Sequence, residues 1–193
     1  ALNYAEKYLG PEDSTTLKLR STYGYILIQS GNYNKGEQVL KSGLKSAERK
    51  FNGSRVHIDM LGNLAMCFYY SGKFEESETG YLEQIGLMEK TDLKNGVLYA
   101  QAVNNLGVLY AEMKRYEEAE PLYLLSKKVR KDIYGEKHPI YGQSLNNLAV
   151  LYKNTKRFEE AEAMYIENLN IQKNLSESSY ARALHNFAIY YSA

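Results

Sequence analysis

The residues that could perform acid–base or nucleophilic chemistry are few in this chain and stand far apart. His57, His138 and His185 have no matched nucleophile near them. The single cysteine, Cys67, lies in the apolar run 65–68, which favours a small buried side chain over a nucleophile. The sequence lacks a glycine-rich phosphate loop, paired carboxylates and any cysteine–histidine cluster with zinc spacing. We therefore expect no enzymatic activity, cofactor or metal ion in this chain, and a catalytic domain would have to lie elsewhere in the protein.

Asparagine is a second residue type with binding chemistry, because it recurs at a fixed interval. Asn104 and Asn146 stand 42 residues apart, and their neighbours Asn105 and Asn147 repeat the same spacing. A side-chain amide offers both a donor and an acceptor, which suits the alternating N–H and C=O groups of an extended peptide. A position repeated in this way points to a repeated structural element that holds it.

The interval of 42 residues extends well beyond these asparagines. Segments 102–110 and 115–120 return as 144–152 and 157–162. Weaker copies of the first segment, spaced by 39 to 42 residues, occur at 23–24, 63–65 and 186–188. About four and a half repeats fill the chain and leave no room for a separate globular domain.

Each repeat contains two segments with helical spacing, joined by a short polar turn such as 71–73 or 113–115. Small residues recur at one position of each segment, which would let the two helices cross closely. They are Gly24, Ala65, Gly107, Ala149 and Ala188 on the first helix, and Gly36, Ser77, Ala119 and Ala161 on the second. One hairpin cannot bury its apolar faces alone, so we expect an all-α stack of hairpins.

Tyrosine, which occurs 19 times while tryptophan is absent, occupies recurring positions in these hairpins. Tyr110, Tyr123, Tyr152 and Tyr165 stand at core positions, so their spacing favours burial over a base-stacking surface for nucleic acid. The basic pair Lys114–Arg115 and its copy at 156–157 precede glutamates, and a solvated turn explains them more simply than phosphate binding.

Composition and charge exclude several classes of protein and partner. With 44% hydrophobic and 24% charged residues, the 193-residue chain is neither disordered nor fibrous. A net charge of +1 indicates no nucleic acid, anionic membrane or acidic substrate. No apolar run reaches the roughly 18 residues of a membrane span, and the lone cysteine fits a reducing compartment. We expect a cytoplasmic chain whose partner is a protein or peptide, with no nucleic acid and no membrane.

The hairpin pattern of a large apolar residue, Gly or Ala, a Tyr three positions later, and Ala and Tyr on the second helix resembles the tetratricopeptide repeat. Segments 118–123, 134–139 and 145–152 are similar to the longer repeats of kinesin light chain and of bacterial arrays, some of which are joined to a CHAT-type protease domain. Arg20, Gly36 and Lys131 depart from the usual pattern. The resemblance implies a right-handed superhelical α-solenoid.

We expect one array over residues 1–193. Its parts are the tail of a preceding repeat at 1–13, repeats at 14–54, 55–96, 97–138 and 139–178, and the first helix of a further repeat at 179–193. Neither end supplies the polar capping helix that normally closes a solenoid, so we also expect a piece of a longer array.

The resemblance implies that the first helices line a concave groove. The groove candidates that it implies are Asp59, Met66, Gln101, Asn104, Val108, Gln143, Asn146, Val150, Lys153, Arg182 and His185. An alternative role for the asparagines is to stabilise contacts between helices or repeats, above all for Asn105 and Asn147. A chaperone-type carboxylate clamp is not expected, because its Asn position holds Tyr25, Met66, Val108, Val150 and Ile189. These residues would form either an apolar groove floor or tighter hairpin packing.

Three functional hypotheses follow from these patterns. The leading one is a non-catalytic binding module that holds a peptide or a partner's helix in the groove. The alternative is a regulatory or sensor segment of a larger enzyme such as a CHAT-type protease. A third is a structural spacer that self-associates through its uncapped ends.

Overall fold

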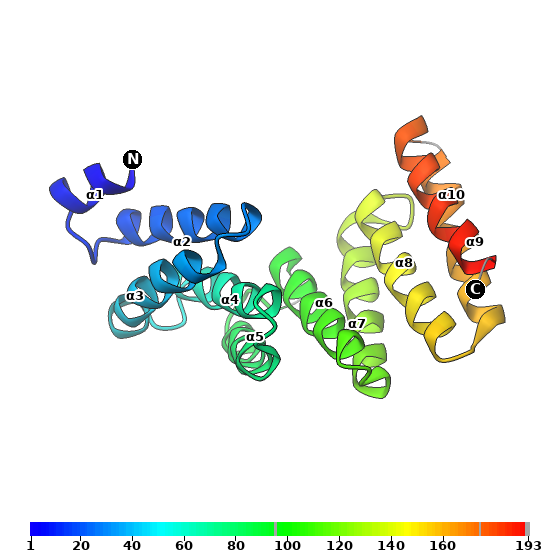
Figure 1. Cartoon of the computed structure of the whole chain (residues 1–193), viewed down its shortest axis with the longest axis horizontal. Coiled ribbons are helices and arrows are strands. Elements are labelled where there is room, and N and C mark those ends of the chain that lie inside the picture. The colour runs from blue at the N-terminus through cyan, green and yellow to red at the C-terminus, as the bar shows by residue number, and fades with distance from the viewer. Residues whose placement is uncertain (95, 174, 192–193) are drawn as a thin grey trace. The chain divides into compact units, whose positions relative to one another are not determined.

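The computed structural model of the protein describes residues 1–94, 96–173 and 175–191, and all regular structure in these ranges is α-helical (Figure 1). The chain forms two compact units, Ala1–Lys94 and Asn95–Ala193. The helices of the first unit are α1 (Leu2–Tyr8), α2 (Ser14–Gln29), α3 (Tyr33–Phe51), α4 (Arg55–Tyr70) and α5 (Phe74–Glu89). Those of the second are α6 (Val97–Glu112), α7 (Tyr116–Tyr134), α8 (Pro139–Asn154), α9 (Phe158–Lys173) and α10 (Glu177–Tyr191).

Consecutive helices pair as antiparallel hairpins within each unit. In the first unit α2 packs on α3 and α4 packs on α5, and in the second α6 packs on α7 and α8 on α9. These hairpins lie inside the ranges expected for the four repeats, whereas α10 begins at Glu177, two residues before the boundary expected at 179. Residues 192–193 of that last expected helix lie outside the described residues.

The two helices of a hairpin cross closely at the small residues, as the sequence predicts. In the first unit the Ser77 hydroxyl donates to the carbonyl oxygen of Ala65 at 2.8 Å. In the second unit a Cβ added at Gly107 would lie 2.9 Å from a ring carbon of Tyr123, closer than real side chains approach. Tyr123 can therefore pack flat on the backbone of α6 only because position 107 has no side chain.

The tyrosines expected in the core are buried there. Tyr110, Tyr123, Tyr152 and Tyr165 each expose 7% or less of their surface. Their burial rules out a shared base-stacking surface, because an aromatic platform for nucleic acid needs open ring faces.

The groups with potential nucleophilic or acid–base chemistry are buried in the first unit as well. Cys67 belongs to a core cluster with Ile28, Leu40 and Phe68, and burial raises the pKa of its thiol. His57 is also buried; its Nδ1 accepts from the backbone N–H of Gly53, and burial lowers its pKa. Burial favours the neutral form of both groups, and for Cys67 it agrees with the predicted small buried side chain.

A left-handed backbone residue closes each hairpin turn. Gly31 and Gly72 occupy this position in the first unit, and Lys114 and Lys156 occupy it in the second, all with φ between 60° and 77°. The next residue donates its N–H back to the first helix, as in the 2.8 Å bond from Arg157 to the carbonyl oxygen of Tyr152. The turn thus satisfies a carbonyl that the helix end would otherwise leave unpaired.

The left-handed residue in these turns predicts opposite effects on stability for two substitutions. Lys156→Gly removes a side chain from a left-handed conformation and should raise the free energy of unfolding by about 0.5–1 kcal/mol, whereas Gly72→Ala should lower it by about 1 kcal/mol. Urea unfolding measures both. Lys128→Gly is the control, because this exposed residue lies inside α7 and its exchange should cost about 1 kcal/mol. A lower free energy of unfolding for Lys156→Gly than for the natural chain would contradict the left-handed conformation of residue 156.

No helix among the described residues has both the length and the apolar composition that a membrane crossing requires.

Candidate functional site

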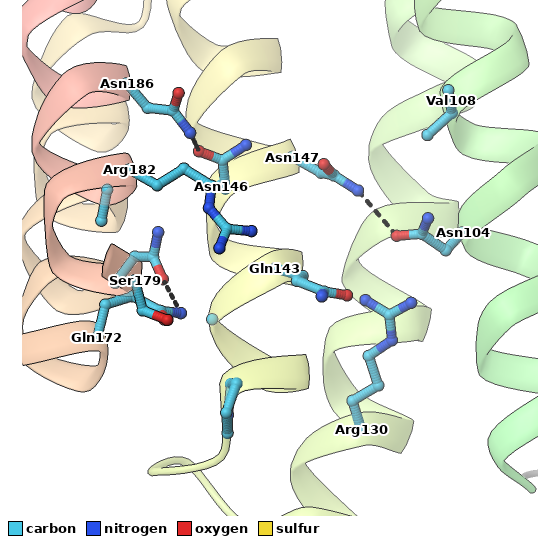
Figure 2. A pocket seen from close by; sticks show the side chains of 14 residues that line it. Asn104, Val108, Arg130, Gln143, Asn146, Asn147, Gln172, Ser179, Arg182 and Asn186 are labelled. Carbon is cyan, nitrogen blue, oxygen red and sulfur yellow. Dashed lines mark hydrogen bonds between the residues drawn. The ribbon is translucent and has the colours of Figure 1, made fainter. Parts of the chain in front are cut away.

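The second unit contains a pocket of about 430 Å³ on the faces of its first helices, α6, α8 and α10 (Figure 2). Its wall is polar but carries no carboxylate. Most of its side chains are amides, namely Asn104, Gln143, Asn146, Asn147, Asn168, Gln172 and Asn186, joined by the guanidinium groups of Arg130 and Arg182. This volume is within the range of pockets that bind small ligands or peptide side chains.

A second pocket of about 340 Å³ adjoins the first in the same unit. The two share Asn104, Arg130 and Gln143, and the second pocket adds Gln101 and Tyr134. Because the shared residues lie in both walls, the two pockets form one polar strip, which we call the amide strip.

The structure brings six of the eleven groove candidates to the amide strip. They are Gln101, Asn104, Val108, Gln143, Asn146 and Arg182. Among them Gln101, Gln143 and Arg182 are exposed, whereas Asn104 is only 9% exposed.

The other five candidates lie outside both pockets. In the second unit, Val150 and His185 are exposed, and Lys153 donates to the carbonyl oxygen of Ile189 at 3.2 Å. In the first unit, Asp59 forms an ion pair with Arg55 at 2.8 Å, and Met66 packs against the cluster around Cys67. For Met66, the observed contact is therefore hairpin packing.

Asparagines connect the first helices of successive repeats. In the second unit the Nδ2 of Asn147 donates to the Oδ1 of Asn104 at 2.9 Å, and the Nδ2 of Asn186 donates to the Oδ1 of Asn146 at 2.8 Å (Figure 2). In the first unit Asn63 donates in the same register to the Ser21 hydroxyl at 2.9 Å. In these three pairs the acceptor lies, in the preceding repeat, one position before the residue that corresponds to the donor.

These bonds show that Asn104 and Asn146 have an interrepeat role, which was the alternative to groove binding. Both residues nevertheless line the pocket. Because Oδ1 already accepts from the next repeat, this bond fixes the direction in which the Nδ2 group of each can donate to a ligand. The network therefore holds its own side chains in fixed directions before any ligand is present.

Arg130 lies on a second helix, α7, and is one of the strip residues that the sequence interpretation missed, as are Asn168 and Gln172 of α9. It is 7% exposed, and its Nη1 donates to the Ser144 hydroxyl at 3.0 Å and to the carbonyl oxygen of Ile140 at 3.4 Å. Burial lowers the pKa of its guanidinium, although arginine stays charged in proteins. A signal did exist in the sequence: Arg130 continues the stripe of core-facing residues 119, 123 and 126 at helical spacing.

The arginines of two hairpin turns, Arg115 and Arg157, are engaged within the protein. In the second unit Arg157 pairs with Glu160 and Glu120 at 2.6 and 2.7 Å, and its guanidinium lies 4.1 Å from the ring centre of Tyr152. Arg115 stacks over Tyr110 in the same way. The ion pairs with Glu118 and Glu160 agree with the prediction that the glutamates after each turn offset its basic residues.

In the ranges that the structure describes, no group of three or more His, Cys, Asp or Glu side chains could hold a metal ion.

Stacked helical hairpins with a polar strip along their first helices define an α-helical repeat protein. The family model of the tetratricopeptide repeat matches residues 56–124 and 98–165, which together span more than half of the chain. The chain therefore belongs to the tetratricopeptide repeat family. This family fold supports a general role as a scaffold for protein interactions.

Solved structures agree with this assignment. The chain is similar to BtubC (BKLC) from P. vanneervenii, with a TM-score of 0.86 and 19% identity over 99% of this chain and 79% of that one. It is also similar to a candidate kinesin light chain from Podosopora anserina with nearly identical TPR-like repeats, with a TM-score of 0.80 and 17% identity over 91% of this chain and 85% of that one. A single-residue variant of the latter protein matches equally well. These similarities confirm the predicted all-α solenoid of hairpins. No curated protein matches the sequence.

The asparagine bonds predict a measurable coupling between repeats. Asn147→Ala should lower the free energy of unfolding by about 1 kcal/mol more than Asn154→Ala, because only Asn147 donates across a repeat boundary. Asn154 is an exposed residue of the same helix and corrects for the change in helix propensity.

A double-mutant cycle with Asn104→Ala isolates the pair and should give a coupling energy of about 0.5–1.5 kcal/mol. A coupling energy near zero would mean that the bond contributes nothing to stacking.

Proposed function

We propose that the chain is a non-catalytic binding module that holds an extended peptide segment of a partner protein along the amide strip. The observation that carries this proposal is the composition of the 430 Å³ pocket, which combines seven amide side chains and two guanidinium groups with no carboxylate. Amides can both donate to and accept from a peptide backbone, whereas a catalytic site needs groups that exchange protons.

An extended peptide fits the strip better than a partner's helix does. In a helix the backbone N–H and C=O groups already bond one another, so a wall of amides finds few partners there. An extended segment leaves these groups open on both edges. The strip offers exposed side chains for them on two consecutive first helices, Gln101 on α6 and Gln143 on α8.

The exposed residues Gln143 and Arg182 are the ligand contacts that can be tested without disturbing the fold. Asn104 and Asn146 are less suitable, because each accepts a hydrogen bond from the next repeat. Their loss would weaken stacking and binding together. Gln143 lines both pockets of the strip, so any peptide that crosses it passes this side chain.

No contact among the described residues favours the alternative of a regulatory segment joined to a protease domain, or a spacer that self-associates. The binding module is therefore the function that we propose.

Peptide display tests the binding module. A random library of peptides of about ten residues, which span about 33 Å when extended, is selected on the chain. The affinities of selected peptides are then measured for Gln143→Ala. We expect a loss of about threefold to tenfold, the effect of removing one or two hydrogen bonds, without a change in melting temperature.

Gln38→Ala is the matched control, because Gln38 is an exposed glutamine of α3 in the other unit. The selected peptides should bind the Gln38→Ala variant with the same affinities as the natural chain. A library that yields no binding peptide would refute the proposed function, and peptides that bind Gln143→Ala unchanged would remove the amide strip from it.

A further inference from the structure

Gly142 lies on α8 at a position where the preceding repeat has a side chain. The residue 42 positions earlier is Ala100 of α6, which is 1% exposed. A Cβ added at Gly142 would lie 2.5 Å from the Oδ1 of Asn168 and 2.8 Å from the Nε2 of Gln172. These two amides of α9, which we call the amide pair, therefore occupy the space that a side chain at residue 142 would fill.

Asn168 differs from the residues at its position in the two preceding repeats. In the first unit the Nε2 of Gln84 donates to a backbone carbonyl oxygen of α4 at 3.1 Å, and in the second unit the Ser126 hydroxyl donates to one of α6 at 2.8 Å. Asn168 instead accepts at its Oδ1 from the Nε2 of Gln172 at 3.2 Å (Figure 2). Its side chain is thus bonded to a second amide of its own helix and not to the first helix of the hairpin.

The hydrogen bond within the amide pair leaves one donor group and one acceptor open. Among the described residues, the Nδ2 of Asn168 has no acceptor and the Oε1 of Gln172 has no donor. Asn168 is only 5% exposed, and a buried polar group without a partner is costly. Both side chains line the 430 Å³ pocket, so a ligand in this pocket can supply the missing partners.

The amide pair lies deeper than the side chains that a peptide backbone would meet. It belongs to the second helix α9, whereas the exposed strip residues Gln143 and Arg182 stand on the first helices α8 and α10. A main chain that follows the first helices contacts those exposed side chains. Only a side chain of the ligand can reach a group as buried as Asn168.

We propose that the amide pair binds the side-chain carboxamide of an Asn or Gln in the peptide that occupies the amide strip. A carboxamide offers an acceptor oxygen and two N–H donors. These groups complement the open donor of Asn168 and the open acceptor of Gln172. This inference rests on the proposed function, because it names a side chain by which the strip selects its peptide.

Other ligand side chains complement the amide pair less well. A carboxylate only accepts and a basic side chain only donates, so each would leave one of the two amides without a partner. An apolar side chain would leave both without one. Arg182 attracts carboxylates, but it is exposed, and an exposed ion pair contributes little.

Binding of the same peptides in three forms tests the carboxamide. Peptides selected from the random library on the natural chain should share an Asn or Gln, which is then replaced by its acid counterpart or by Leu. We expect each replacement to weaken binding by about tenfold, the effect of losing one or two hydrogen bonds.

Gly142→Ala displaces the amide pair and keeps the fold. Ala is the residue of the preceding repeat at this position, and it is a better helix former than Gly, so the melting temperature should not fall. The affinity ratio of the amide and Leu forms should fall to about one, because the added Cβ takes the place of both amides. Gly86→Ala is the matched control, since a Cβ on this residue of α5 meets no atom within 4 Å and should leave the full ratio.

Asn168→Ser tests the amide pair independently of residue 142. Ser126 shows that this position accepts serine, and its hydroxyl bonds the first helix. The substitution removes the open donor and the bond that orients Gln172. The ratio of the amide and Leu forms should again fall to about one, without a loss of the circular-dichroism signal of the helices.

Each remaining outcome overturns the inference in a distinguishable way. Selected peptides that share no Asn or Gln, or that bind equally well with Leu, would overturn the carboxamide assignment and leave the binding module intact. Tighter binding of the acid form would assign the pocket to a carboxylate. A full amide preference in both Gly142→Ala and Asn168→Ser would remove the amide pair from recognition. A selection that yields no peptide would overturn the proposed function and this inference together.

Discussion

A helical hairpin has an apolar face on each side, so it is stable only when another hairpin covers that face. The small residues bring the two helices of a hairpin together, as Gly107 does beneath Tyr123. Neighbouring hairpins then meet through contacts such as that of Tyr165 with Phe187, whose ring centres are 5.6 Å apart, and through asparagine bonds such as that from Asn147 to Asn104. Stacking therefore determines where every first helix lies, and with it the positions of the side chains that line the pocket.

The same contacts restrict the rotamers of the side chains in the amide strip. A solvated asparagine samples several rotamers, and ordering it on binding costs entropy. In this protein Asn104 and Asn146 are already held by the following repeat. A residue that stabilises the stack can therefore also present a fixed donor to a ligand, which is why the two roles considered for these asparagines do not exclude each other.

The sequence predicted the hairpins, their close crossings and the buried tyrosines, because each depends on residues within one repeat. It left the role of Asn104 open. The bond from Asn147 depends on how far neighbouring hairpins are shifted along each other, and a period of 42 residues does not define this shift. Arg130 was missed for a related reason. A basic residue on the core-facing stripe of α7 can be placed in a groove only once the packing of α8 against α7 is known.

Because α10 supplies Ser179, Arg182, Ala183 and Asn186 to the pocket wall, binding there is linked to the local unfolding of this helix. Single helices of a folded protein can open locally at a lower free energy than global unfolding requires. A molecule that binds only when α10 is packed in place shifts the local unfolding equilibrium of α10 toward its folded form, and the shift grows with the affinity of the molecule. Hydrogen exchange of the backbone amides of α10 would therefore slow when the pocket is occupied, so its rate would report binding.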